Sequence, residues 1–307
     1  MSEVTLAVHG LRKTIGRRDI IKSLDFELHR GEVFGFLGPN GAGKTTTIRM
    51  LVGLMRPTAG TVQVCGYDVH KQFPEAMRQM GCIVENPELY RYLSGWNNLL
   101  YFARMMDGVD EARVSEVVEL VGLTARIHDK VKTYSLGMRQ RLGIAQALLG
   151  RPKVLILDEP TNGLDPSGIR EMREFIRFLA AQEGLSVLVS SHLLSEIQLM
   201  CDRVAIISGG EVVRVGAVHS LLSSQEKLCW RLHPLEEGVA VLRRLCGEEH
   251  VDADTEPGAV LTPSDAERIG VWNRELVNAG VTVTEMSRRV PTLEDLFLEL
   301  TGGRGID

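Results

Sequence analysis

The sequence predicts an α/β fold with a mainly parallel sheet that helices cover on both faces. One observation is a set of short, continuous apolar runs separated by longer helix-like stretches. Such runs are typical of strands buried on both faces, as in parallel sheets. A second observation is that each run ends in glycine or polar residues, where ligands of these sheets bind. The runs are Val33–Leu37, Val154–Leu157, Ser186–Val189 and Val204–Ile207.

Length and composition limit the function classes. At about 150 residues per domain, 307 residues favour two domains. The net charge of −5 argues against a protein whose main work is binding nucleic acid, because such proteins carry a basic excess. No apolar run approaches the roughly 18 residues of a membrane span, and the N-terminus lacks the pattern of a secretory signal. The five widely spaced cysteines fit no disulfide framework, so we expect a reducing, cytosolic context.

The element pattern changes twice along the chain. Helices are predicted at Ser94–Met106 and Asp110–Val121 without a strong strand between them, which indicates a helical insertion at about residues 90–150 of a first domain, residues 1–217. Residues 218–307 form a predicted accessory domain.

The accessory domain is predicted to be a small α+β unit. Its expected elements are a strand at Lys227–His233, a helix at Leu235–Cys246, strands at 248–254 and 258–262, a helix at Ser264–Asn278 and a strand at Val281–Met286. That order, β-α-β-β-α-β, is the order of ferredoxin-like folds. A last helix is expected at Thr292–Thr301.

A phosphate-binding loop follows the first apolar run. It matches the pattern G-x-x-x-x-G-K-[ST] and continues into a helix-like stretch. Its glycines let successive backbone N–H groups face the phosphates, and the helix N-terminus adds a partial positive charge. Lys44 would reach the β- and γ-phosphates, and the Thr45 hydroxyl would ligate Mg²⁺. The sequence therefore predicts a P-loop NTPase core whose nucleotide-binding residues are Gly38, Pro39, Asn40, Gly41, Ala42, Gly43, Lys44, Thr45 and Thr46.

Two acids end the second apolar run. Asp158 and Glu159 lie about 110 residues after the phosphate loop. Asp158 would hold Mg²⁺, mostly through water, and Glu159 would orient or deprotonate the attacking water. A solvated strand end is the alternative interpretation for both residues.

Three further segments carry a resemblance to a known family. Tyr134–Arg141 resembles the LSGGQ-x-QR signature, Asn162–Pro166 resembles the D-loop, and His192 stands where the switch histidine is found. From residue 4 to about 217 the chain thus resembles the ATP-binding subunits of ABC transporters. The resemblance implies that two such domains sandwich two ATP molecules, as a homodimer or with a paired ATPase subunit. Ser135 and Gly137 would then meet the γ-phosphate bound to the opposite protomer. An ordinary helix cap at Ser135 and a plain structural histidine at His192 are the alternatives.

Four positions depart from the family pattern. Leu136 and Met138 replace the usual glycine and glutamine of the signature. Ile15 stands where an adenine-stacking aromatic is common; it can cover the base but offers no π face. Glu85 replaces the usual glutamine beside the metal site, where it would act as a metal-site and catalytic residue. This glutamate resembles the subgroup that handles bacitracin, lantibiotics and related peptide antibiotics.

Together these features predict the ATPase subunit of an exporter. The segment Pro291–Phe297 resembles the end of ABC-2 exporter ATPases. The chain would hydrolyse ATP with Mg²⁺ at the cytoplasmic face of the membrane, bind no nucleic acid and work with a separate transmembrane permease. We expect the permease to dock near Tyr90, Tyr92 and Trp96, although core packing of these rings is equally consistent. Alternatives are an ABC ATPase acting on ribosomes or DNA, and a binding module without catalysis.

Overall fold

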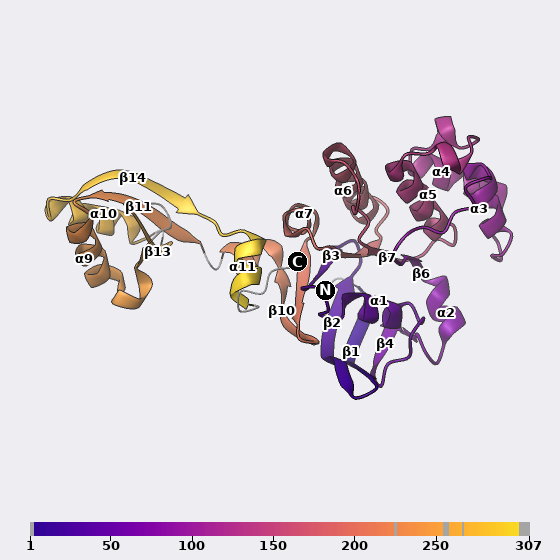
Figure 1. Ribbon diagram of the computed structural model, residues 1–307, viewed down its shortest axis with the longest axis horizontal. Coiled ribbons are helices and arrows are strands. Elements are labelled where there is room, and N and C mark those ends of the chain that lie inside the picture. Colours follow the sequence, from indigo (N-terminus) through magenta and orange to yellow (C-terminus); the bar gives the residue numbers. More distant parts are fainter. Residues whose placement is uncertain (1–2, 224–225, 254–257, 266, 301–307) are drawn as a thin grey trace. The chain divides into compact units, whose positions relative to one another are not determined.

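The computed structural model describes residues 3–223, 226–253, 258–265 and 267–300 (Figure 1). The chain divides into two compact units. One contains the chain up to Ala217 together with Leu300, and the other spans Val218–Glu299. Each unit has its own hydrophobic core, so each is described by itself.

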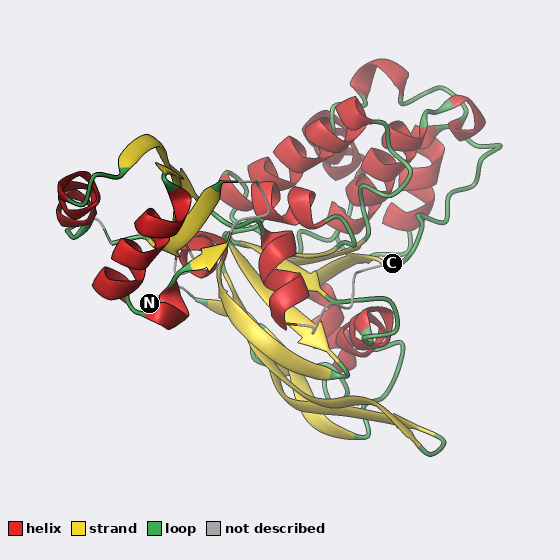
Figure 2. Ribbon diagram, turned by 60° about the vertical axis from the view of Figure 1, so that its left-hand side comes forward, coloured by secondary structure: helices red, strands yellow, loops and turns green. Residues whose placement is uncertain are grey.

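The first unit is built on a ten-stranded sheet, half of which is the parallel array that the apolar runs predict. Neighbouring strands of this array are parallel, and every residue of β3, β7 and β8 is buried, which explains why the runs do not alternate. Figure 2 shows the strands of this unit with helices packed around them. In spatial order the parallel strands are β9 (Arg203–Ser208), β3 (Val33–Leu37), β8 (Ser186–Ser190), β7 (Val154–Asp158) and β6 (Met80–Ile83).

The other half of the sheet is largely antiparallel, and the sequence analysis does not predict it. Its long strands alternate between buried and exposed residues over only part of their length, because bulges interrupt their register. One antiparallel ladder, between β10 and β9, joins the two halves. In spatial order these strands are β5 (Tyr67–Asp68), β4 (Ala59–Val64), β1 (Val4–Ile15), β2 (Arg18–His29) and β10 (Glu211–Ala217).

The helices of the first unit fall into two sets. Those that alternate with the strands are α1 (Lys44–Leu51), α2 (Phe73–Arg78), α6 (Pro166–Ala181) and α7 (Leu194–Met200). The insertion between β6 and β7 holds α3 (Gly95–Ala103), α4 (Glu111–Leu120), α5 (Leu136–Leu148) and 3₁₀ turns at Thr124–Arg126 and Val131–Thr133, and its three α-helices gather together in Figure 1. Ser94, Asp110 and Ser135 each cap one of these helices, accepting a hydrogen bond from a backbone N–H three residues on.

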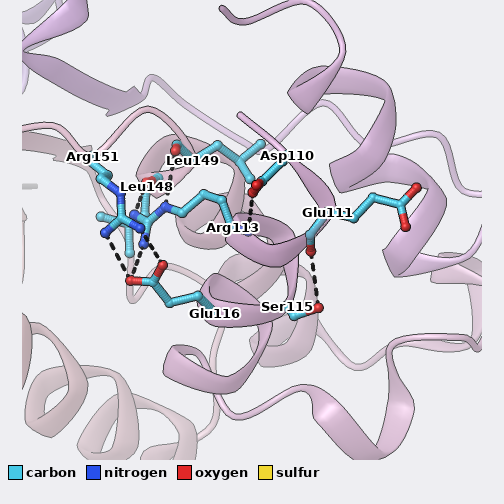
Figure 3. A network of polar contacts seen from close by, with 8 residues as sticks. All are labelled: Asp110, Glu111, Arg113, Ser115, Glu116, Leu148, Leu149 and Arg151. Carbon is cyan, nitrogen blue, oxygen red and sulfur yellow. Dashed lines mark hydrogen bonds and ion pairs between the residues drawn. The ribbon is translucent and has the colours of Figure 1, made fainter. Parts of the chain in front are cut away.

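A polar network fastens the C-terminal end of α5 to α4 (Figure 3). Arg113 donates from Nη2 to the carbonyl of Leu148 at 2.6 Å and from Nε to that of Leu149 at 3.2 Å. Its Nη1 also lies 2.6 Å from the Glu116 carboxylate, which accepts two hydrogen bonds from Arg151. Carbonyls at a helix end lack partners within the helix, so Arg113 satisfies groups that would otherwise be unpaired.

The second unit has the ferredoxin-like topology that the element order predicts. Its sheet order is β12-β13-β11-β14 and all neighbouring strands are antiparallel. The buried Trp230 and Trp272 belong to its core, and Trp230 Nε1 donates to Thr262 Oγ1 at 2.9 Å. Its elements are α8 (Val218–Ser223), β11 (Lys227–His233), α9 (Leu235–Cys246), a 3₁₀ turn (Glu248–His250), β12 (Asp252–Ala253), β13 (Ala259–Pro263), α10 (Ile269–Asn278), β14 (Thr282–Arg289) and α11 (Leu293–Leu300, which ends in the residue counted with the first unit).

Two elements in this unit begin clearly later than predicted, whereas the other boundaries differ by no more than about one turn. The strand expected at 248–254 is limited to Asp252–Ala253 among the described residues, because the polar run Glu248–His250 turns as a 3₁₀ helix after Gly247. The helix expected from Ser264 begins at Ile269, after a turn in which Asp265 Oδ1 accepts hydrogen bonds from backbone N–H groups of Glu267 and Arg268. Residues 254, 266 and 301 of the predicted elements lie outside the described residues.

Candidate nucleotide-binding site

The residues singled out in the sequence follow four adjacent parallel strands. β3 leads into the phosphate loop, β8 into His192, β7 ends at Asp158, and β6 is followed by Glu85. Because neighbouring strands run in the same direction, these segments leave the sheet at one edge. Four segments distant in sequence are thereby brought to one place.

The phosphate loop wraps around the ammonium group of Lys44. The Nζ atom donates to the Gly38 carbonyl at 2.5 Å and lies 3.4 Å from the Pro39 carbonyl. Burial lowers the pKa of Lys44, while the nearby carboxylates of Glu159 and Asp158 act in the opposite direction. The loop thus holds Lys44 in place before any phosphate arrives, and Thr45 and Thr46 follow half-buried on the first turn of α1.

Gly43 is the residue at which the loop becomes a helix. Its φ of 103° is in the region that favours glycine, and it occupies the N-cap position of α1. A Cβ there would lie 2.3 Å from Cδ1 of Ile21. The turn that directs the first N–H groups of α1 out of the sheet therefore requires glycine on both conformational and steric grounds.

Asp158 is a buried carboxylate that accepts a hydrogen bond from Ser190 Oγ, which donates to Oδ1 at 2.5 Å. Burial raises the pKa of Asp158, and the negative charges of Glu159 and Glu85 add to the increase, although the Ser190 hydroxyl and the nearby backbone N–H of Glu85 act against it. A cation beside Asp158 would offset that unfavourable charge.

Glu159 and His192 form a pair. The backbone N–H of Glu159 donates to the hydroxyl and carbonyl oxygens of Ser190, at 3.1 and 3.2 Å, and its φ of 51° is rare for a residue with a side chain. Nδ1 of His192 lies 2.6 Å from Oε2 of Glu159. An ionised carboxylate can only accept, so Nδ1 carries the proton. The pair holds the Glu159 carboxylate at the strand edge, where a water could be oriented.

Ser135 is the N-cap residue of α5, and Gly137 lies in its first turn. Ser135 Oγ accepts from the backbone N–H of Met138 at 3.2 Å, and Ser135 is exposed. The segment that follows β7 lies beside this helix start: a Cβ on Gly163 would lie 3.1 Å from the Leu136 side chain, and a Cβ on Gly137 would lie 3.8 Å from that of Leu164. Among the described residues, no hydrogen bond that we find joins Ser135 or Gly137 to the phosphate loop.

Ile15 lies at the turn between β1 and β2. It is the last residue of β1, pairs with Arg18, and is 50% exposed. An aliphatic side chain so exposed is available for contact with a flat ring.

Two residues that the sequence analysis did not select shape this site, and a third holds the backbone at Tyr90 in the helical insertion. Ser190 contacts both acids, and its place at the end of a buried strand was a usable signal. Arg49 forms an ion pair with Glu85, which sequence order alone could not reveal. Asn98 is fully buried and binds both the backbone N–H and the carbonyl of Tyr90, at 2.8 and 3.1 Å.

The donor set fits a nucleoside triphosphate with a hard divalent cation. Backbone N–H groups at the start of α1 and the Lys44 ammonium suit phosphate oxygens. The Thr45 hydroxyl and the Asp158 carboxylate are oxygen ligands of the kind that Mg²⁺ prefers. No helix of the described residues is both long and apolar enough to cross a membrane.

Comparison with known proteins agrees with this geometry. The family model described as ABC transporter matches residues 21–162. The chain is 48% identical over 301 residues to the ABC transporter ATP-binding protein YhcH of Bacillus subtilis (strain 168), covering 98% of this chain and 97% of that protein. It is 39% identical over 298 residues to the bacitracin transport ATP-binding protein BcrA of Bacillus licheniformis, covering 95% and 96%.

Solved structures give the same result. The chain is similar to a structure described as the ATP-binding subunit of an ABC transporter, with 31% identity and a TM-score of 0.63 over 71% of this chain and 91% of the other. These relatives favour transport over the ribosome and DNA alternatives. The chain belongs to the ATP-binding subunits of ABC transporters, the family that binds and hydrolyses ATP to power transport through a membrane permease.

Proposed function

We propose that this chain powers the export of a peptide antibiotic or similar drug-like compound through an ABC-2 type permease, at the cytoplasmic face of the membrane. The observation that carries the proposal is the meeting of Lys44, Asp158, Glu159 and His192 at one sheet edge. The compound is suggested by the bacitracin transport relative and by Glu85 at the glutamine position. We expect the chain to bind no nucleic acid.

Each residue of the sheet edge has a proposed role. Lys44 and the backbone of residues 38–46 bind the β- and γ-phosphates, and Ile15 covers the base. Thr45, Asp158 and Glu85 hold Mg²⁺, which when bound neutralises charge on the phosphates. Glu159 orients the attacking water and takes up its proton. His192 fixes the Glu159 carboxylate through Nδ1 and directs Nε2 away from it.

ATP is proposed to join two copies of residues 1–217. Ser135 is exposed and stands at the N-terminus of α5, so its hydroxyl and the backbone at Gly137 suit a phosphate that arrives from outside the chain. A site completed by a second protomer makes association depend on the nucleotide. The partner is a second copy or a paired ATPase subunit, and residues 218–307 act as an accessory domain.

The permease is proposed to dock on an exposed aromatic group of the insertion. Tyr90 lies between Tyr92 and Tyr101, with ring centroids 6.0 and 5.3 Å apart, and all three rings are exposed. Trp96, included in our sequence-based expectation, is half-buried beside His128 and suits packing better than docking. Next to the tyrosines, a groove of about 290 Å³ lies between residues 86–91 and the start of α5. Exposed aromatic rings beside a groove suit a short helix of a partner.

The proposal is tested with the chain copurified with its membrane partner. ATP hydrolysis is measured with and without bacitracin, for the unchanged chain and for Lys44→Met. We expect bacitracin-stimulated hydrolysis that Lys44→Met abolishes. The matched control is Lys13→Met, which removes a half-buried lysine bonded to the Arg56 carbonyl and should leave hydrolysis intact. Hydrolysis that persists in Lys44→Met, or that bacitracin does not stimulate, contradicts the proposal.

A further inference from the structure

An arginine of the phosphate-binding helix holds the Glu85 side chain. Arg49 lies in the last turn of α1, and its Nη2 atom is 2.6 Å from Oε1 of Glu85. Glu85 also faces the opposite side of the site, because its backbone N–H lies near enough to the Asp158 carboxylate to act against the increase of its pKa. The residue therefore stands between α1, which begins at the phosphate loop, and the acid at the end of β7.

The backbone of Glu85 is fixed, whereas its side chain is free to exchange partners. Its φ of 66° is rare for a residue with a Cβ, and such conformations persist only where the surroundings impose them. The side chains of Arg49 and Glu85 are 43% and 62% exposed. An ion pair in contact with so much water is weak, so a stronger cation could replace the guanidinium at small cost. A neutral glutamine at this position could not form the ion pair.

We propose that Arg49 is a positioning residue for Glu85, and that Arg49 and the divalent cation compete for the Glu85 carboxylate. Without nucleotide the carboxylate is held against α1. When the nucleotide and its cation bind, the carboxylate leaves Arg49 and turns to the cation and its waters. This inference rests on the proposed function, which places Glu85 beside the cation.

The competition is tested by the affinity for Mn²⁺, measured by electron paramagnetic resonance on the full chain saturated with ADP. Arg49→Met removes the competing charge but keeps most of the side-chain volume, so Mn²⁺ should bind about two- to fivefold tighter, the range that an exposed ion pair allows. In a Glu85→Gln background the same substitution should have no effect. Arg49→Lys should restore an affinity near that of the unchanged chain.

The matched control is Arg30→Met. Arg30 also forms an exposed ion pair, with Glu3 at 3.7 Å, but it precedes β3 and so stands at the opposite edge of the sheet. Its loss removes the same charge from the chain without freeing a carboxylate at the site. We expect Mn²⁺ affinity to stay unchanged.

The remaining outcomes separate this inference from the proposed function. If Arg49→Met tightens Mn²⁺ binding equally with and without Glu85→Gln, or leaves it unchanged or weaker, the competition is overturned while the ATP site stands. If Glu85→Gln alone leaves Mn²⁺ affinity unchanged, both the placement of Glu85 and the competition are wrong. If the unchanged chain binds no nucleotide, both the proposed function and this inference are wrong.

Discussion

At the scale of single residues, the site carries charged groups whose arrangement suits a bound cation better than it suits the fold alone. Asp158 is buried with a raised pKa, beside two other carboxylates. Glu85 and Glu159 both have positive φ angles. Strained backbone and unfavourable charge at one place are typical of functional sites, where a ligand later offsets them.

The raised pKa of Asp158 predicts that Asp158→Asn stabilises the nucleotide-free chain at neutral pH. Ionisation is less favourable in the folded than in the unfolded state, so the unchanged chain loses stability as pH rises from the ordinary carboxyl pKa of about 4 through the raised value. The asparagine variant lacks this loss. Thermal unfolding at pH 4, 5.5 and 7 should show a difference that widens with pH.

The control for that series is Glu183→Gln, an exposed acid after α6, which should show little change across the same range. A gap between Asp158→Asn and the unchanged chain that is constant, or that reverses sign at neutral pH, argues against burial as the cause of the raised pKa.

The exposed Ile15 predicts weak recognition of the base. Ile15→Tyr should tighten ATP binding by about fivefold or more, because stacking a base on an aromatic ring contributes about 1–3 kcal/mol. Isothermal titration with ATP and GTP measures this directly. Ile15→Leu serves as the control and should bind both nucleotides like the unchanged chain. Identical ATP and GTP affinities before and after Ile15→Tyr would mean that Ile15 does not face the base.

At the scale of elements, the orientation of α5 depends on its far end. Its N-terminus presents Ser135, while Arg113 and Glu116 of α4 secure its C-terminus and the residue Arg151 that follows (Figure 3). Hydrogen bonds from both Arg113 and Arg151 hold the pKa of Glu116 below its ordinary value. The start of the signature helix is therefore positioned from the opposite end of a 13-residue helix.

Arg113→Met is predicted to destabilise the chain by about 1–3 kcal/mol, because two helix-end carbonyls lose their donor in a largely buried place. Chemical denaturation measures the loss. The control, Arg126→Met, breaks an ion pair with Asp129 in the same insertion that is about half exposed, and should cost less than about 1 kcal/mol. Equal losses of stability in the two variants would show that the hydrogen bonds from Arg113 to the two carbonyls stabilise the chain no more than an exposed ion pair does.

Elements with strong local signals were predictable from sequence. The buried strands β3, β7, β8 and β9 show as apolar runs, and Ser94 marks the start of α3 because its side chain caps it. The antiparallel strands β1 and β2 were not predicted, because bulges and partial exposure interrupt the alternation of buried and exposed residues along them. Chemistry carried by sequence motifs was also predictable, whereas the Arg49–Glu85 ion pair joins residues 36 positions apart through packing and has no local signal.

At the scale of the whole molecule, the chain holds one complete phosphate loop and one signature segment. The signature presents an exposed Ser135. We propose that a chain built in this way completes its site by meeting another, and the hydrolysis of ATP would then remove the group that joins them. Association and release of protomers is the step that would move a permease.

The most direct test of this account is the molar mass in solution of the Glu159→Gln variant, measured in the presence of ATP. The substitution keeps the size of the side chain and removes the base, so ATP should remain intact and hold two copies together. Light scattering should give twice 34.0 kDa with ATP and 34.0 kDa with ADP, and Lys44→Met in the same background should stay at 34.0 kDa. A Glu159→Gln chain that remains single in saturating ATP, both alone and with its membrane partner, would contradict the account.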